Sequence, residues 1–301
     1  MVAYETGVAT SPSDLLGKLG VFIEANGWSY DGGSSGAVIY NGASGVGIFA
    51  GVNATATEIH TRGCLGYLGA SAWNAQPGHS GITHIMNLGA GPYTSYHIWV
   101  GDEDGNDYVH LTVEKTAGEF RHWALGKLVP YGSMTGGVYS DSTLLTDSAG
   151  QRNSPDSSLH RHLCDANQNT ALGQVWVDYD GKVNTWQGVQ NAGVFTTTLH
   201  CGSTRTLGLY ANFMNIGYQR WNFRTPQWPM LYFANRAGSL RSPIGRMPNI
   251  RAINVRNFFP GQEVTISGDT WKIFPVFQKQ TEAVGNDIVS SGLYGYAHLM
   301  P

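Results

Sequence analysis

One helical stretch stands at the start of this 301-residue chain, and short β-type runs follow it almost to the end. The stretch is SPSDLLGKLGVFIEANGW, and it contains clear start and stop signals. Ser11 is a favourable N-cap, Pro12 suits the first helical position, and Asp14 puts a negative charge near the positive end of the helix dipole. A closing Asn-Gly pair favours termination. The sequence therefore predicts one main helix, over residues 12–26.

The apolar side chains of this helix gather on one side. Leu15, Leu19 and Phe22 follow one another at spacings of four and three, with Leu16 and Ile23 beside them. Two internal glycines each cost up to about 1 kcal/mol relative to alanine, so the helix needs a packing partner. We take Leu15, Leu19 and Phe22 as the candidate assembly or packing face. The partner is either the chain's own sheet or a neighbouring subunit.

The rest of the chain has the pattern of antiparallel strands. Runs such as GAVIYNG, SYHIWVGD, DYVHLTVEK and DTWKIFPVFQK are rich in β-branched and aromatic residues and end at Gly, Asn, Asp or Pro. Turn sequences at DEDGND (102–107) and at Asp180-Gly181 favour hairpins. The predicted fold class is mainly β, an antiparallel β-sandwich-like architecture with one N-terminal α-helix.

The domain organisation is read from the segments between the strand-like runs. Residues 132–173 are polar, rich in small residues and weakly patterned, which predicts a loop-rich excursion. No internal repeat and no linker composition divides the sequence. We therefore expect residues 1–301 to form a single β-rich structural unit.

Charge and composition exclude several classes of function. The formal net charge is −3, and the 18 Lys and Arg residues are scattered, which argues against nucleic acid as a partner. No apolar run approaches the roughly 18 residues of a membrane span. Only 13% of residues are charged, against about 25% in an ordinary soluble protein, so part of the surface is expected to be covered by other subunits.

The first ten residues have neither a basic nor an apolar signal region, so we expect folding in a cytosol. Three cysteines at wide spacings, Cys64, Cys164 and Cys201, do not form a disulfide framework. We expect all three to be buried free thiols.

Motifs for catalysis and metal binding are weak. His160, His162 and Cys164 alternate in HRHLCD and would share one face of a strand, but no second pair at metal-site spacing completes the set. The oxygen-rich 102–107 stretch lacks the glycine and glutamate of an EF-hand loop, so a hairpin turn explains it better. No nucleophile elbow is present. We expect no metal, no cofactor and no catalytic residue.

Aromatic clusters are the remaining signal. Aromatic rings beside polar groups stack on sugars or act as hot spots at protein interfaces, although in a large β protein most of them fill the core. The candidate binding aromatics are Trp176, Trp186, Trp221, Phe223 and Trp228.

Three stretches together resemble a family of virion structural proteins of tailed bacteriophages: the opening YETGVATSPSDLLGKLGVFIEANGW, the middle GEFRHWALGKLVPYGSMTGGVY, and the closing MPNIRAINVRNFFPGQEVTISGDTWKIFPVFQK with GLYGYAHL. The resemblance implies a non-enzymatic component of the tail tip or baseplate, or of the neck, made in the host cytoplasm and located in the virion. It implies multivalent contacts with other virion proteins and a homo-oligomeric ring. No catalytic residue carries over. The alternative is a tail module that binds host-surface glycans.

Overall fold

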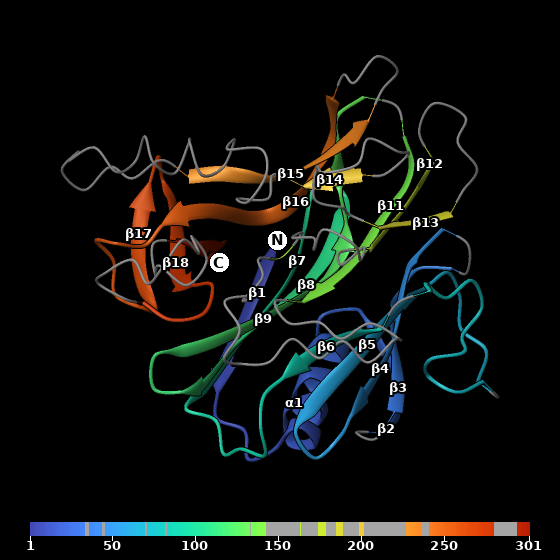
Figure 1. Ribbon diagram of the computed structural model, residues 1–301, viewed down its shortest axis with the longest axis horizontal. Helices are drawn as coiled ribbons and strands as arrows, with labels where there is room; N and C mark the ends of the chain where they lie inside the picture. The colour runs from blue at the N-terminus through green and yellow to red at the C-terminus, as the bar shows by residue number, and fades with distance from the viewer. Residues whose placement is uncertain are drawn as a thin grey trace.

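The computed structural model describes residues 1–33, 36–43, 46–69, 71–81, 83–132, 134–142, 163, 174–178, 185–188, 199–201, 227–235, 241–279 and 294–301. Over these ranges the chain is mainly β, with a single helix, α1 (Pro12–Ala25), and every pair of neighbouring strands runs antiparallel (Figure 1). The predicted fold class is confirmed. The strands form three sheets, and their stacking is sandwich-like.

The middle layer is a seven-stranded sheet, which we call the central sheet. In spatial order its strands are β1 (Val2–Gly7), β7 (Ser95–Glu103), β8 (Asn106–Thr116), β9 (Glu119–Lys127), β11 (Thr135–Ser142), β12 (Gln174–Asp178) and β13 (Thr185–Gly188). A two-residue turn joins β7 to β8, and both of its residues, Asp104 and Gly105, have positive φ angles of 55° and 74°. This is the hairpin predicted at 102–107.

Two further sheets cover the faces of the central sheet (Figure 1). The helix-side sheet has the order β2 (Ser29–Gly33), β3 (Gly36–Asn41), β4 (Ile48–Ala54), β5 (Glu58–Cys64) and β6 (His84–Asn87). The C-terminal sheet has the order β14 (Leu199–Cys201), β15 (Gln227–Asn235), β16 (Arg241–Asn254), β19 (Tyr294–Leu299), β18 (Asp269–Pro275) and β17 (Gln262–Ile266), and β10 (Val129–Pro130) pairs with β16.

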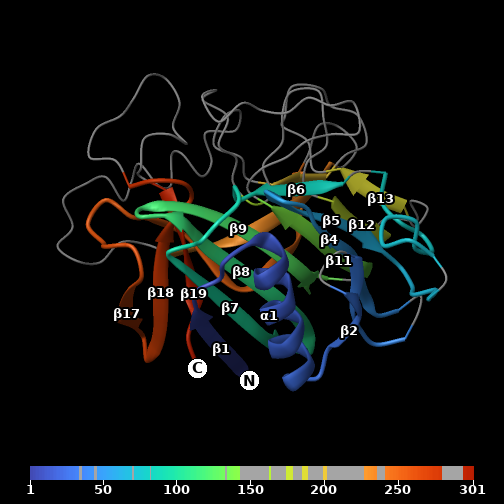
Figure 2. The same cartoon turned by 90° about the horizontal axis from the view of Figure 1, so that it is seen from below.

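The central sheet is buried on both faces because its side chains alternate between two cores. Along β8, Val109 and Leu111 join the core that contains α1 and the helix-side sheet. Tyr108 and His110 point the other way, where Tyr108 joins a cluster with Phe274 of β18. Figure 2 shows α1 between the helix-side sheet and the central sheet. The helix therefore belongs to the contact between the helix-side sheet and the central sheet, and the second internal contact is that between the central sheet and the C-terminal sheet.

The helix forms as its local sequence predicts. Ser11 has an extended backbone, and its Oγ accepts a hydrogen bond from the backbone N–H of Asp14 at 3.1 Å. Pro12 occupies the first turn, Asn26 is the C-cap, and Gly27 follows with a φ of +83°. The helix ends at Ala25, one residue before the predicted boundary. These caps satisfy backbone groups that the helix termini leave free.

One boundary of the predicted excursion over 132–173 is wrong. Residues Thr135–Ser142 form β11, which pairs with β9 on one edge and β12 on the other. Ser140 and Asp141 are buried there, at 0% and 1% exposure. Backbone pairing on both edges outweighs the low β-propensity of these polar residues, because tertiary context overrides propensity in a central strand. Residues 143–173 lie outside the described ranges, except Leu163.

Candidate functional site

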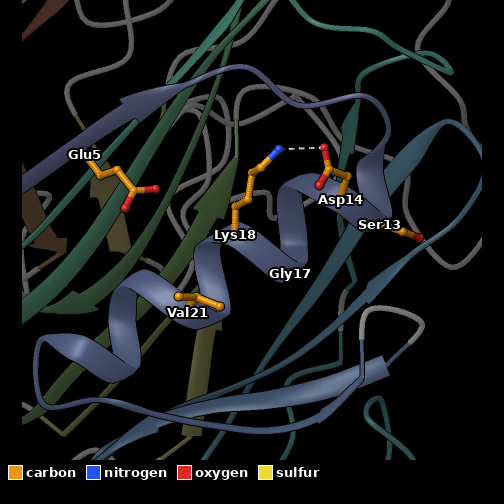
Figure 3. Close-up of a pocket in the computed structure, with 6 residues that line it drawn as sticks. All are labelled: Glu5, Ser13, Asp14, Gly17, Lys18 and Val21. Atoms are coloured by element: carbon orange, nitrogen blue, oxygen red, sulfur yellow. Dashed lines mark hydrogen bonds and ion pairs between the residues drawn. The ribbon is translucent and has the colours of Figure 1, made fainter.

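A surface groove runs between strand β1 and the outer side of helix α1 (Figure 3). Its volume is about 430 Å³. We call it the β1–α1 groove, and its lining residues are Glu5, Ser13, Asp14, Gly17, Lys18 and Val21. Strand β1 is the edge of the central sheet, so the groove lies beside a strand that pairs on one side only among the described strands. Exposed strand edges are common places for another chain to bind.

The charged side chains of the groove are already paired. Lys18 Nζ donates to Asp14 Oδ2 at 2.8 Å, as the dashed line in Figure 3 shows, and to the backbone oxygen of Val8 at 2.9 Å. The hydrogen bond from Lys18 is the largest cause that lowers the pKa of Asp14, followed by one from the backbone of Thr10. Glu5 accepts a hydrogen bond from the hydroxyl of Tyr96 at 2.8 Å. With two carboxylates and one ammonium, the groove is slightly acidic.

Apolar side chains in and near the groove are exposed to solvent. Val21 is 71% exposed, and Val8, on the connection from β1 to α1, is 63% exposed. A Cβ atom placed on Gly17 would meet nothing within 4 Å, so the helix backbone is open there. Positions 14, 17, 18 and 21 form one helical stripe by their spacing. The apolar spacing in the sequence indicates the opposite stripe of the helix and gives no signal for this one.

The predicted assembly or packing face points inward. Leu15 and Leu19 are 0% and 2% exposed and lie in the core that α1 shares with the helix-side and central sheets. Phe22 is half-buried against the same core. The helix therefore packs on the chain's own sheets, which resolves the alternative left open by the sequence. A subunit contact at α1 would have to use its outer stripe.

The candidate binding aromatics are distributed over two different cores. Trp176 and Trp186 are opposite each other on β12 and β13, and both are half-buried against the core that contains α1. Trp186 Nε1 donates to the backbone oxygen of Gly78 at 2.7 Å, so this indole is held by a loop of the helix-side sheet. Trp228 is half-buried against the C-terminal core. Trp221 and Phe223 lie outside the described residues.

A second polar feature is internal. Four histidines converge between the central and C-terminal sheets, and we call them the histidine layer: His97 of β7, His110 of β8, His122 of β9 and His298 of β19. All four are at most 9% exposed. The ring centroid of His298 lies 5.7 Å from that of His110 and 6.4 Å from that of His122. None of these four histidines belongs to a motif that the sequence alone would mark as a site.

Burial disfavours the charged form of three of these rings. It lowers the pKa of His97 to about 4 and that of His110 to about 3, and it holds the pKa of His298 well below its usual value. For His298 the neighbouring histidines lower the pKa further. No set of three or more His, Cys, Asp or Glu side chains within the described ranges is arranged to hold a metal ion. His160, His162 and Cys164 fall outside those ranges.

Cys64 is buried and free, and burial is the largest cause that raises the pKa of its thiol to about 12. Cys164 and the side chain of Cys201 lie outside the described part of the structure.

Neither a protein-family model nor a curated protein matches the sequence. In the part of the chain that the structure describes, no helix has the length and apolarity needed to cross a membrane.

Proposed function

We propose that this chain is a non-enzymatic structural component of a tailed-phage virion, at the tail tip or baseplate, and that it acts through contacts between subunits. The resemblance in the opening, middle and closing stretches supports this assignment. The three-layer fold also suits it, because a sheet buried on both faces gives a rigid body, and among the described strands β1 leaves one edge of that sheet unpaired beside the outer stripe of the helix.

The observation that carries the proposal is the β1–α1 groove with its solvent-exposed Val21. Its occupant in this proposal is a second copy of the chain. Phe259 on the β16–β17 connection is 76% exposed, and Lys279 Nζ lies 5.3 Å from the centroid of its ring. This apolar and cationic protrusion complements a groove that is apolar at Val21 and acidic at Glu5. Exposed aromatic anchors often dominate binding at interfaces.

The protrusion and the groove lie on opposite sides of the central sheet, one with the C-terminal sheet and the other with α1 (Figures 1 and 2). Contact between two different surfaces of identical chains is heterologous, and it produces a closed ring when the rotation between copies closes. Such an arrangement would give the homo-oligomeric ring that the resemblance implies.

The test measures the mass of the purified chain in solution by light scattering after size exclusion. We expect an oligomer for the natural sequence. Val21→Glu in the groove and Phe259→Glu in the protrusion should each shift it to monomer. The first adds a carboxylate to a groove that already contains Glu5 and Asp14, and the second replaces the aromatic anchor with a charge of the same sign as the groove. Val46→Glu is the matched control, since Val46 is 74% exposed on the β3–β4 turn.

A monomeric natural chain, or a Val46→Glu variant that dissociates as fully as the other two, would contradict the groove contact. Mass spectrometry of purified phage particles tests the virion assignment separately, because particles that lack the chain would exclude it. Binding of the monomer to host polysaccharide would instead favour the glycan-binding alternative.

A further inference from the structure

Two strands at the edges of different sheets pair on one side only among the described strands. Strand β1 ends the central sheet and pairs with β7, and strand β17 ends the C-terminal sheet and pairs with β18. The backbone N–H and C=O groups of an antiparallel strand point alternately to its two sides. Those on a free side are a template for a further strand. The hydrogen-bond pattern of each sheet decides which residues present them.

The hairpin between β7 and β8 sets the pattern in the central sheet. Asp104 and Gly105 both have positive φ angles, as in a type I′ turn, which makes the flanking residues Glu103 and Asn106 a pair with hydrogen bonds in both directions. Every second residue of β7, counted back from Glu103, therefore bonds to β8. The residues between them bond to β1 on the other side.

On β1 the odd-numbered residues are consequently the ones that bond to β7, because they lie opposite the even-numbered residues of that strand. The backbone oxygen of Ala9 continues this alternation beyond the end of β1, since it accepts from the N–H of Tyr93 at 2.8 Å. The other backbone groups of β1 point to its free edge, beside the β1–α1 groove. They belong to Val2, Tyr4 and Thr6.

Strand β17 follows the same rule. Its turn to β18 consists of Ser267 and Gly268, with φ angles of 55° and 96°, so its even-numbered residues bond to β18. The other side of β18 agrees with this phase. There the backbone oxygen of Thr270 accepts from the N–H of Met300 at 2.8 Å, which leaves the odd-numbered residues of β18 to bond to β17. The backbone groups at the free edge of β17 are those of Glu263 and Thr265.

The side chains of the two edges match as well. Lys272 Nζ donates to Glu263 at 2.9 Å and lies 5.4 Å from the centroid of the Tyr4 ring, so the edge-bonding residues of both strands turn to the space between the central and C-terminal sheets. Val264 and Ile266 point to the opposite face, where they are half-buried against a cluster of their own sheet. Residues opposite each other in an antiparallel pair share a face. Pairing the two free edges would therefore turn these two apolar side chains toward the groove.

We infer that the second copy binds at the β1–α1 groove by strand addition, with β17 of one copy pairing antiparallel with β1 of the next. The inference rests on the proposed contact between copies and specifies its hydrogen bonds. Edge-bonding residues must lie opposite one another, and one register keeps all five residues of β17 within β1. It places Thr265 opposite Tyr4 and Glu263 opposite Thr6.

This register also explains the apolar contact. Val264 falls opposite Glu5 and Ile266 opposite Ala3, on the face of the groove that Val21 lines. Phe259, which precedes β17, then lies beyond the end of β1 that leads into α1. The protrusion and the strand that follows it thus bind along one continuous surface of the neighbouring copy.

The first test is hydrogen exchange of the full chain at residue resolution, comparing the natural oligomer with the Val21→Glu monomer. The amides of Tyr4, Thr6 and Thr265 should exchange slowly in the oligomer alone. An oligomer in which they exchange as fast as in the monomer would overturn strand addition and leave the contact between copies standing. A natural chain that is monomeric would overturn both.

A matched pair of variants at Thr265 tests the backbone bond itself. Thr265→Pro removes an N–H at the free edge, a place where a strand tolerates proline. It should raise the dissociation constant about tenfold, because a hydrogen bond between copies is lost. Thr265→Val keeps the N–H and a β-branched side chain, so its dissociation constant should match that of the natural chain. Equal dissociation constants for the two variants would refute the bond.

Cross-linking tests the register and does not depend on the proline variant folding. A chain with Glu5→Cys and Val264→Cys should form covalent oligomers under mild oxidation, because these positions would be an opposed pair without hydrogen bonds, whose Cα atoms lie close enough for a disulfide. Glu5→Cys with Thr265→Cys is the control, since the second side chain points to the other face. The natural chain, with its three cysteines, gives the background. Equal cross-linking of the two variants, or none in the first, would overturn the register.

Discussion

Two glycines of α1 allow a matched test of the packing, because the same substitution should have opposite effects at positions three residues apart. A Cβ atom on Gly17 meets nothing within 4 Å. A Cβ atom on Gly20 would lie 2.9 Å from both Cδ1 and Cγ of Tyr30 on β2. Cγ is the base of the ring, so rotation of the ring about the Cβ–Cγ bond cannot relieve the contact.

The expected magnitudes follow from two terms. Replacing Gly by Ala inside a helix gains about 1 kcal/mol, and this gain is common to both sites. At Gly20 the added methyl group also overpacks the core, which costs about 1–3 kcal/mol. Gly17→Ala should therefore stabilise the chain by about 1 kcal/mol. Gly20→Ala should be neutral or destabilising by up to about 2 kcal/mol, and the difference between the variants isolates the contact with Tyr30.

The assay is urea unfolding followed by circular dichroism, with the free energy of unfolding compared at an unchanged m-value. Light scattering under the same conditions keeps subunit assembly apart from folding, because Gly17 also lines the β1–α1 groove. Equal stabilisation by both substitutions would show that the ring of Tyr30 does not cover Gly20. Destabilisation by Gly17→Ala would refute the open outer stripe.

Three further outcomes are expected. Leu19→Asp should cost several kcal/mol of unfolding free energy, roughly 3–5, because it buries an unpaired charge in place of a packed side chain, and unchanged thermal stability would contradict that. Cys64 should not react with thiol reagents in the native chain. In the denatured chain all three thiols, those of Cys64, Cys164 and Cys201, should react, and finding only one would reveal a disulfide. Trp186→Phe should lose about 1 kcal/mol in urea unfolding because the indole hydrogen bond is absent, and an unchanged midpoint would argue against that bond.

Local sequence determines those parts of the fold that it predicts well. The cap at Ser11 and the stop at Asn26 act within a few residues, so the helix boundaries could be found without tertiary information. Asp104 and Gly105 tolerate positive φ, which specifies the hairpin between β7 and β8. The strand runs are visible because apolar and aromatic residues mark them.

The pairing of distant strands could not be predicted in the same way. Strand β1 pairs with β7, and Tyr4 lies opposite Trp99, across more than ninety residues. Strand β11 is missed because Ser140 and Asp141 look like loop residues until the neighbouring strands on both edges are known. The sequence likewise does not show that both faces of the central sheet are buried. Its strands pack against two different cores, so their side chains still alternate between two chemical types, as they would in a strand with one face in solvent.

The two candidate sites were missed for separate reasons. The outer stripe of α1 has one exposed apolar residue, Val21, among polar ones, and such a pattern is ordinary for a solvated helix face. The histidine layer did leave a trace: YHIW, VHLT, RHWA and AHLM each contain one histidine inside an apolar strand run. Their convergence depends on registers that join β7, β8 and β9, and on the packing of β19 above them.

The different chemistry of the two faces of the central sheet also affects how the sheet can assemble. Side chains alternate with a period of two, so a slip of one residue in the pairing of β8 would exchange His110 with Leu111. The slip would place imidazoles among aliphatic side chains and, in the same step, put an aliphatic side chain into the network of Thr112 and His122. The slip would therefore destabilise both cores at once. Misaligned pairings of the central sheet are then unfavourable on both of its faces, which leaves few near-native alternatives in which the folding chain could be trapped.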